Sequence, residues 1–417
     1  MKLITFLGTT EYKTTRYVLG EQSHETQFFP AALARFIRPA QVLVCATPTV
    51  QQHHNLHDLG QQLAEASIPW EPLSIPEGHS EADLWKIFDA LTGAVNEGER
   101  VTFDVTHSFR SLPMLAFLAI AYLKAAKRVQ VDRVLYGAWE ARDATTNRTP
   151  VFDLTPFVAL LDWLTATSRF VETGDGHALA DLLKAGMPAG PAMRDDITAR
   201  ALGRNLKAAA DAIESVSLAL QVTRPIEVMQ SAAQLQTTLQ QALPGILERA
   251  HPFGILAEQV TQAYGQFALE SPTETAALGE GLRQQLQMID WYVRRRHVVQ
   301  AATLAREWVV SGLALQFNQS MFDYDKGRHP VEQALNNAVE RRKPQARNIY
   351  PGPCDALLEQ LPQVENLVKV WSQLAELRND IAHVGMKISP KPAALLKQKV
   401  EAIYPQLMIL AQQWGLA

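Results

Sequence analysis

The hydrophobic pattern of this chain changes once, near Thr155, and this change limits the folds that the chain can adopt. Before it, short apolar runs rich in β-branched residues alternate with amphipathic helical stretches. Such alternation is typical of a parallel, Rossmann-like sheet covered by helices. After Thr155 the strand patterns stop and helical stretches follow one another. The sequence therefore predicts an α/β domain followed by an all-α region.

The individual elements follow from the same pattern. In the first part we expect strands at 3–7, 41–46, 70–75, 100–105 and 131–139, with helices at 50–66, 81–96 and 109–127 between them. The later helices are expected at 156–170, 197–222, 225–243, 282–317, 364–382 and 393–414. Because 417 residues exceed what one hydrophobic core usually holds, we expect three regions. They are an α/β domain at 1–160, a helical linker or bracing region at 161–280, and an all-α domain at 281–417.

The composition narrows the cellular setting and the partners. The net charge of −4 leaves no overall basic field, so any RNA contact must come from a local cluster. The two cysteines, Cys45 and Cys354, give no disulfide framework. His53 and His57 have the i, i+4 spacing of a zinc pair but lack a third ligand, so we expect no metal site. Without an apolar signal segment or a membrane-length apolar stretch, we expect a soluble cytoplasmic protein with no membrane partner.

Polar residues follow several expected strands, at the edge where a parallel sheet binds its ligands. Hydroxyl groups, backbone N–H groups and a helix N-terminus together suit a phosphate. Neither G-x-G-x-x-G nor a Walker A sequence is present, which disfavours an ordinary dinucleotide or ATP site. The alternative is helix capping by Ser and Thr, with Asp104 organising its own turn. The candidate ligand residues are Gly8, Thr9, Thr10, Thr106, His107, Ser108 and Arg110, with Thr47 and Thr49 after a further strand.

A second set of candidates lies near the C-terminus, in the stretch from Leu377 to Gly385. His383 can take or return a proton near neutral pH, and Arg378 can hold a phosphate and stabilise the charge of its transition state. RNA supplies its own nucleophile, the 2′-OH, so this pair suits RNA cleavage without a metal. Five residues of helix place the two side chains about 140° apart. The alternative is a simple helix end, with His383 beside the helix dipole and Gly385 as the stop.

Two basic runs in the helical region are weaker candidates. Arg294–His297, with Trp291 and Tyr292 just before it, suits an RNA backbone and a stacked base, or else a solvated helix face. Glu340–Lys343 and Arg347 form a second basic patch with the same two interpretations.

The stretch Asp104–Ser108 resembles the D-x-T-H-[GS] signature of CRISPR-associated Rossmann-fold (CARF) proteins, and Leu7–Thr10 followed by Tyr12 is also similar to that family. The resemblance covers roughly residues 1–160. It implies a domain that dimerises and binds a cyclic oligoadenylate second messenger across the two-fold axis. It assigns the pocket to Gly8, Thr9, Thr10, Thr106, His107, Ser108 and Arg110, with Ser108 in place of the family's more usual glycine.

The stretch Arg378–His383 looks like the R-x-x-x-x-H motif of HEPN ribonucleases, in an all-α setting behind a CARF-like domain. The resemblance implies that two such motifs, one per subunit, form one composite site in a dimer. It gives Arg378 the role of phosphate stabiliser and His383 that of general acid/base. Asn379 would orient the phosphate or Arg378, and Asp380 is expected to be structural.

Together the two resemblances imply a CARF–HEPN endoribonuclease of type III CRISPR antiviral defence. We expect it to cleave single-stranded RNA and to need no metal or other cofactor. A cyclic oligoadenylate is expected as its allosteric activator, with tetra-adenylate as the expected ring. Cleavage would leave a 2′,3′-cyclic phosphate and a 5′-OH. The expected assembly is a homodimer or a higher oligomer of dimers.

Two alternative functions stay open at this point. In the first, the CARF-like domain also degrades its own activator, because Thr9, Thr10, His107 and Ser108 are polar enough to position a 2′-OH attack within the ring. In the second, the chain is a non-enzymatic, ligand-controlled regulator that binds nucleic acid through the helices at 197–243. The near-neutral charge balance of those helices disfavours the second.

Overall fold

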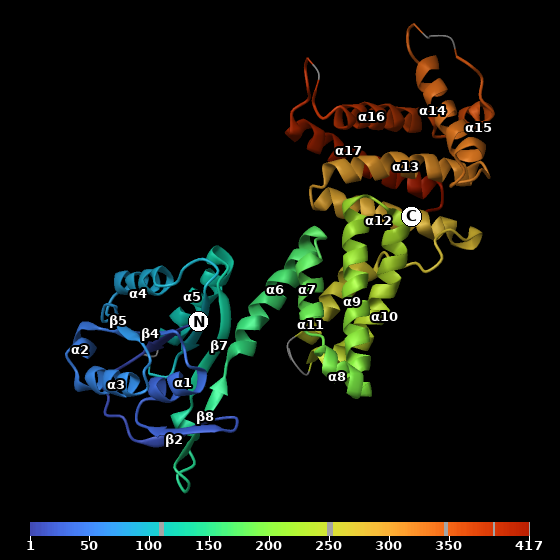
Figure 1. The fold of residues 1–417 in the computed structure, drawn as a ribbon. Coiled ribbons are helices and arrows are strands. Elements are labelled where there is room, and N and C mark those ends of the chain that lie inside the picture. The colour runs from blue at the N-terminus through green and yellow to red at the C-terminus, as the bar shows by residue number, and fades with distance from the viewer. Residues whose placement is uncertain (108–111, 248–252, 346–348, 387, 417) are drawn as a thin grey trace. The chain divides into compact units, whose positions relative to one another are not determined.

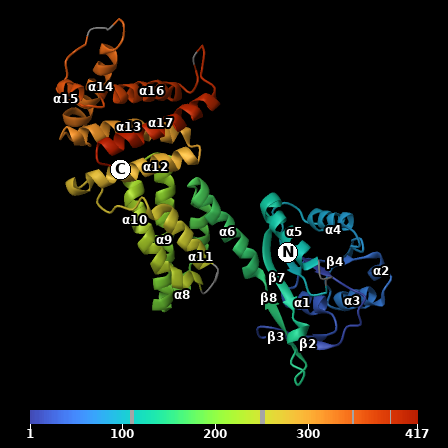
Figure 2. The same ribbon diagram turned by 180° about the vertical axis from the view of Figure 1, so that it is seen from behind.

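The computed structural model describes residues 1–107, 112–247, 253–345, 349–386 and 388–416 (Figures 1 and 2). The chain divides into two compact units, Met1–Asp162 and Trp163–Ala417, which are described separately below. Unit 1 is α/β and unit 2 is all-α, so the predicted fold class is confirmed.

Within the described residues, unit 1 contains an eight-stranded sheet of order β3-β2-β8-β7-β6-β1-β4-β5. Its central part, β7-β6-β1-β4-β5, is parallel throughout, as predicted. The strands are β1 (Lys2–Phe6), β2 (Thr15–Leu19), β3 (Gln22–Thr26), β4 (Gln41–Ala46), β5 (Trp70–Ser74), β6 (Arg100–Asp104), β7 (Gln130–Gly137) and β8 (Arg148–Asp153).

Three of these strands were not predicted, namely β2, β3 and β8. They form one side of the sheet, where β2 pairs antiparallel with β3 and β7 pairs antiparallel with β8. Strand β3 reads Gln-Ser-His-Glu-Thr and is largely exposed, and β8 contains a proline between polar ends. Strands β3 and β8 bury little apolar surface, so they carry no clear hydrophobic alternation.

Two hydrophobic cores cover the two faces of the sheet, because successive strand side chains point to opposite sides. Ile4 and Phe6 pack in one core with α4 (Glu81–Gly93) and α5 (Leu112–Lys127). Leu3 and Val42 pack in the other with α1 (Phe29–Ile37) and α3 (His54–Glu65). The short helix α2 (Pro48–Gln51) follows β4, and a 3₁₀ turn, η1 (Trp139–Ala141), follows β7.

Helix α6 (Thr155–Thr173) crosses the boundary between the units along the chain. Its first half belongs to unit 1, where Val158 is buried in the core beside α5 and Asp162 pairs with Lys124 at 2.5 Å. Its second half belongs to unit 2, where Thr167 and Phe170 are fully buried.

Helices and the loops between them make up the described residues of unit 2, and Figures 1 and 2 both show α9 and α10 side by side. Large aromatic residues, including Trp308 and Trp371, lie fully buried among the last helices. No described helix is long and apolar enough to cross a membrane. The helices are α7 (His177–Ala185), α8 (Gly190–Asp195), α9 (Ile197–Gln221), α10 (Pro225–Leu247), α11 (Phe253–Gly265), η2 (Thr275–Ala277), α12 (Leu278–Arg294), α13 (Val298–Gln316), the π-helix η3 (Tyr324–Arg328), α14 (His329–Arg341), α15 (Asp355–Glu359), α16 (Val364–Ala382) and α17 (Ala393–Gln413).

Candidate functional site

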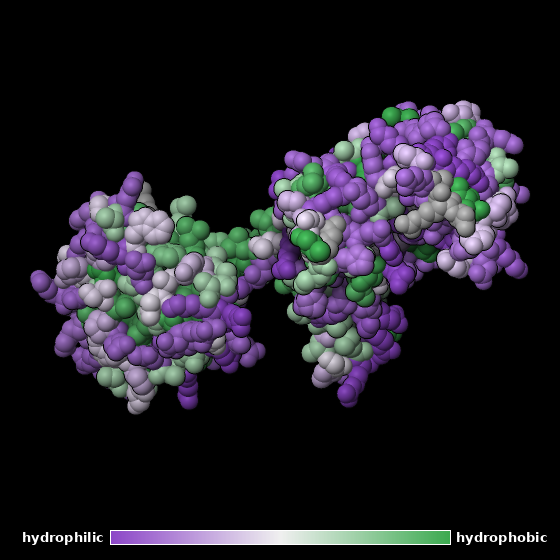
Figure 3. Space-filling model, turned by 90° about the horizontal axis from the view of Figure 1, so that it is seen from above, coloured by the Kyte–Doolittle hydropathy of each residue, from purple (hydrophilic) through white to green (hydrophobic). Residues whose placement is uncertain are grey.

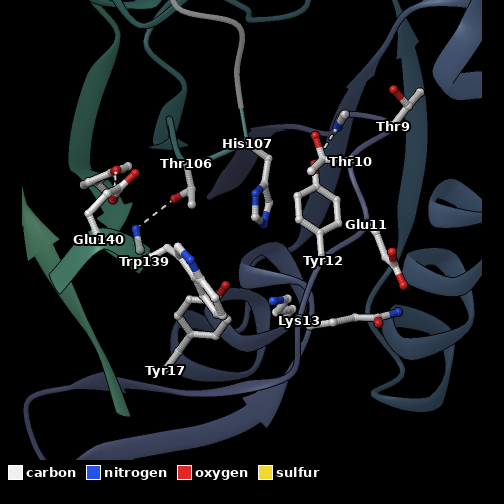
Figure 4. A pocket seen from close by; sticks show the side chains of 14 residues that line it. Thr9, Thr10, Glu11, Tyr12, Lys13, Tyr17, Thr106, His107, Trp139 and Glu140 are labelled. Atoms are coloured by element: carbon white, nitrogen blue, oxygen red, sulfur yellow. Dashed lines mark hydrogen bonds between the residues drawn. The ribbon is translucent and has the colours of Figure 1, made fainter. Parts of the chain in front are cut away.

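A cavity of about 470 Å³ opens in unit 1 at the carboxyl ends of β1, β6 and β7 (Figure 4). Side chains and backbone from all three strand ends line it, together with residues of β2 and η1. The lining residues are Gly8, Thr9, Thr10, Glu11, Tyr12, Lys13, Tyr17, Gln27, Thr106, His107, Tyr136, Gly137, Trp139 and Glu140.

The loop after β1 is fixed from two sides. The Gly8 N–H donates to the hydroxyl oxygen of Tyr12 at 2.9 Å. The buried side chain of Asn55 donates to the carbonyl oxygens of Gly8 and Thr10 at 2.9 and 3.0 Å. Burial raises the pKa of Tyr12 to about 12, so its hydroxyl keeps its proton at neutral pH. The exposed threonines Thr9 and Thr10 are therefore presented by a well-held backbone.

The turn after β6 is organised by Asp104, which is fully buried. Its carboxylate accepts from Thr5 Oγ1 at 2.6 Å and from the Thr106 N–H at 2.9 Å. Burial raises the pKa of Asp104 to about 6, although these hydrogen bonds oppose the shift. Thr106 Oγ1 in turn accepts from the Gly137 N–H at 2.8 Å, which ties this turn to β7. Asp104 thus holds the strand ends in place by hydrogen bonds, but it does not line the cavity.

His107 lies at the centre of the cavity, beside the ring of Tyr12 (Figure 4). The two ring centroids are 4.1 Å apart and the planes are tilted by 46°. Its Nε2 accepts a hydrogen bond of 3.4 Å from the Phe29 N–H. Burial lowers the pKa of His107 to about 3, so the ring is neutral at physiological pH and carries its proton on Nδ1.

The wall that sequence reasoning missed comes from the end of β7 and from η1. Tyr136 donates its hydroxyl to Glu140 at 2.6 Å, and Trp139 lies under the guanidinium of Arg142 at 4.6 Å. Gly137 is needed here because a Cβ would lie 2.9 Å from the ring of Phe29. The expected strand at 131–139 ends at the same edge as the other two, which was the available signal.

Five of the predicted ligand residues, Gly8, Thr9, Thr10, Thr106 and His107, line this one cavity. Ser108 and Arg110, which were predicted with them, lie outside the described residues. Thr47 and Thr49 have other roles. Thr47 caps α2 by accepting from the Val50 N–H at 3.4 Å, and Thr49 Oγ1 donates to Glu77 at 2.6 Å.

The second set of predicted residues lies at the end of α16 in unit 2. Arg378 and Asn379 are exposed, and Arg378 Nη1 donates to Asn379 Oδ1 at 3.4 Å. His383 is also exposed and forms the C-cap of the helix, with its N–H donating to the Asn379 carbonyl oxygen at 3.2 Å. Val384 and Gly385, with φ of 45° and 75°, follow this cap, so the helix ends here as the alternative interpretation predicted.

The surroundings of this motif are polar. Asp380 is buried, in line with a structural role, and Glu376 sits between the ammonium groups of Lys391 and Lys399. Hydrogen bonds from these two lysines lower the pKa of Glu376 to about 2. Figure 3 shows a largely hydrophilic surface on this side of unit 2, where α16 lies.

Two weaker predictions from the sequence are corrected by the structure. Trp291 and Tyr292 are buried core residues, so they cannot stack on an RNA base, because their rings pack against other side chains. The Glu340–Lys343 patch is neutralised by ion pairs, and Arg347 lies outside the described residues. Arg341 pairs with Asp355 and Glu359, Arg342 with Glu359 and Glu365, and Lys343 with Glu340.

Histidines near carboxylates do not form a convincing metal centre among the described residues. His53 caps α3 by accepting from the Asn55 N–H at 3.2 Å. His177, Asp181 and Glu214 bring three ligand atoms close together, but Lys184 already pairs with Glu214 at 2.5 Å. A cation there would have to displace that ammonium group.

The comparisons with known proteins concern mainly one segment of unit 2. Residues 159–268 match the family model described as CRISPR-associated protein MJ1674, second domain. CRISPR-associated protein MJ1674 of Methanocaldococcus jannaschii is 27% identical over 113 residues, which are 26% of this chain and 18% of that protein. The predicted relationship to CRISPR-associated proteins is thus confirmed over this segment, while the chain aligns with less than a fifth of that relative.

One solved structure resembles the chain over its whole length. It is Enterococcus italicus Csm6 bound to cyclic hexa-2'-fluoro-hexa-dAMP, with a TM-score of 0.44 and 11% identity, covering 100% of this chain and 99% of that one. At this score the likeness carries no conclusion about ligand or activity.

Proposed function

We propose that this chain is an endoribonuclease of type III CRISPR defence that a cyclic oligoadenylate switches on. The observation that carries the proposal is the cavity of unit 1, where five residues predicted from separate strand ends meet. The exposed Arg378/His383 motif on an all-α unit supports the second half. The match of residues 159–268 to a CRISPR-associated protein supports the biological setting.

The lining chemistry suits an oligoadenylate. The rings of Tyr12, Tyr136 and Trp139 offer flat apolar surfaces for adenine bases. Hydroxyl groups of Thr9 and Thr10, and the cation Lys13, suit phosphate and ribose oxygens. The cavity volume of about 470 Å³ is typical of a site for a drug-sized ligand. It is smaller than the volume of a whole ring of four adenylates. Two copies of unit 1 would therefore share one ring.

The proposed reaction uses the RNA's own 2′-OH. The 2′-oxygen attacks the adjacent phosphorus, the bond from phosphorus to the 5′-oxygen breaks, and a 2′,3′-cyclic phosphate and a 5′-OH result. His383 accepts the proton of the 2′-OH or returns one to the 5′-oxygen, and two copies of the chain divide these tasks. Arg378 stabilises the negative charge that grows on the phosphoryl oxygens, and Asn379 orients Arg378.

The test is RNA cleavage by the purified chain in EDTA, with cyclic tetra-adenylate and cyclic hexa-adenylate supplied in separate reactions. We expect ligand-dependent cutting of single-stranded RNA and a 5′-OH product. His383→Ala and Arg378→Ala should each lower the rate at least about 100-fold without changing ligand binding. Lys369→Ala, an exposed residue of the same helix, should cut normally. Intact RNA with both rings would overturn the proposal.

Degradation of the activator by unit 1 is the weaker candidate. The Nε2 of His107 already accepts from the Phe29 N–H, and burial lowers the pKa of this ring to about 3. Such a histidine is a poor proton donor at neutral pH, although it can still give a hydrogen bond through Nδ1. Linear product from the His383→Ala chain would show that unit 1 cuts the ring by other groups.

A further inference from the structure

A second cavity, of about 360 Å³, lies entirely within unit 2. It is enclosed by the turn between α9 and α10, by α12 and α13, and by the segment that leads into η3. None of its residues belongs to the Arg378/His383 motif or to the cavity of unit 1.

One polar side chain that lines this cavity has no hydrogen-bond partner among the described residues. Gln285 of α12 is 6% exposed, and its side chain forms no hydrogen bond within the described part of the chain. The amide atoms of Gln285 are therefore left to water or to a ligand in the cavity. This amide offers one acceptor and two donors to whatever enters the cavity.

Arg328, another polar residue of the lining, has partners within unit 2. Arg328 donates to Ser311 Oγ at 2.9 Å and to the Met321 carbonyl oxygen at 3.0 Å, and it also pairs with Glu307. Arg328 ends the π-helix η3, where a Cβ on Gly327 would lie 1.9 Å from the Ser320 carbonyl oxygen. The geometry therefore requires glycine, and short π-helical turns often mark functional sites.

The remaining lining divides into apolar faces and a charged rim. Leu304 and Met321 are buried, and Phe322 keeps 51% of its surface exposed at the mouth. Arg224 lies exposed at the rim and forms no ion pair with any described residue. The lining thus combines an amide, apolar side chains, an aromatic ring and a cation with the carboxylates of Glu227 and Glu307, and the first four suit the parts of a nucleotide.

We propose that this cavity binds one nucleotide of the RNA strand, with the base edge on the Gln285 amide and a phosphate near Arg224. The inference rests on the proposed ribonuclease function and adds a base-reading site to it. A glutamine amide can pair with two neighbouring groups on a base edge, so the site discriminates between bases. Phe322 stacks on a base at the mouth, and Arg224 holds the backbone without regard to sequence.

The experiment measures binding separately from cutting. The full chain carrying His383→Ala is titrated with AMP, GMP, CMP and UMP, and with fluorescent ten-nucleotide RNAs of a single base, without cyclic oligoadenylate. We expect one base to bind best and Gln285→Leu to weaken that base about tenfold and remove the preference. Gln287→Leu, an exposed neighbour on α12, should change nothing. Arg224→Gln should weaken all four nucleotides alike.

Thermal unfolding shows whether the Gln285→Leu chain is still folded. Because the Gln285 amide forms no hydrogen bond to a described residue, Gln285→Leu should leave the melting temperature of the free chain close to that of the parent chain. Equal binding of every nucleotide by parent and Gln285→Leu chains would overturn the inference, as would no nucleotide binding at all. If the proposed function fails, the result is different. The parent chain, which keeps His383, then leaves RNA intact in the presence of cyclic oligoadenylates, while nucleotide binding persists.

Discussion

Arg295 donates a hydrogen bond of 2.8 Å to the carbonyl oxygen of Val171, near the end of α6. Its guanidinium lies 4.3 Å from the ring of Trp291, which is buried at the end of α12. The same α6 begins in unit 1, where Val158 is part of the core beside α5. Helix α6 thus contributes residues to both units, and within unit 2 its second half is bonded to Arg295, which follows α12.

This contact predicts that Arg295→Met uncouples ligand binding from RNA cleavage, if the proposed function holds. The thioether chain still packs on Trp291 but gives no hydrogen bond to Val171. Ligand affinity at unit 1 should stay the same, while activated cleavage falls about tenfold, within the range of typical allosteric coupling. Arg294→Met is the matched control, since Arg294 is exposed and pairs only with Asp290 among the described residues. Equal loss in both variants, or none in either, would argue against the coupling.

Tyr12→Phe is predicted to weaken the activator site. The substitution leaves the Gly8 N–H without its acceptor and frees the loop that carries Thr9 and Thr10. Loss of one hydrogen bond of this kind costs about 1 kcal/mol, so we expect the Kd for cyclic tetra-adenylate to rise about fivefold in calorimetry. Tyr350→Phe, at a side chain that is 76% exposed in unit 2, should leave it unchanged. An unaltered Kd for Tyr12→Phe would remove this loop from the site.

Gly137→Ala is predicted to destabilise unit 1. The new methyl group would meet the ring of Phe29 at 2.9 Å and that of Tyr17 at 3.0 Å, and both rings are buried. Overpacking of this kind costs about 1–3 kcal/mol in the free energy of unfolding. Gly93→Ala is the control, because nothing lies within 4 Å of its Cβ position on α4. Urea unfolding compares the two, and equal midpoints would contradict the prediction.

The sequence predicted the strand ends of unit 1 well because parallel strands bring their carboxyl ends to one edge. Gly8 is far from Thr106 and His107 in the chain, yet this rule alone puts them together. The hydrogen bonds that hold the loop after β1 could not be predicted from the sequence. Asn55 lies inside a helix whose pattern looks ordinary, and its bonds to Gly8 and Thr10 depend on how α3 packs on the sheet.

The aromatic residues of unit 2 show where the sequence pattern fits two structures equally well. Trp291 beside a basic run has the same sequence pattern whether it stacks on RNA or fills a core. In the fold it contacts Arg295 and the ring of His297, whose plane is parallel to its own at 5.7 Å. Gln285 likewise sits in an amphipathic helix among other glutamines, and only the tertiary packing makes it line a cavity.

The final prediction concerns pH and the buried carboxyl of Asp104. Its ordinary pKa of 3.8 applies to the unfolded chain, whereas burial raises the pKa to about 6 in the folded chain. Between these values the folded state keeps a proton that the unfolded state has released, so stability falls as pH rises through this window. Asp104→Asn removes the effect, so its stability relative to the parent chain should rise by about 2.4 kcal/mol from pH 4 to pH 7. Thr5→Val removes a hydrogen bond that lowers the pKa, so it should steepen the parent's decline. Urea unfolding at each pH measures both, and a constant difference between Asp104→Asn and the parent chain would refute the raised pKa.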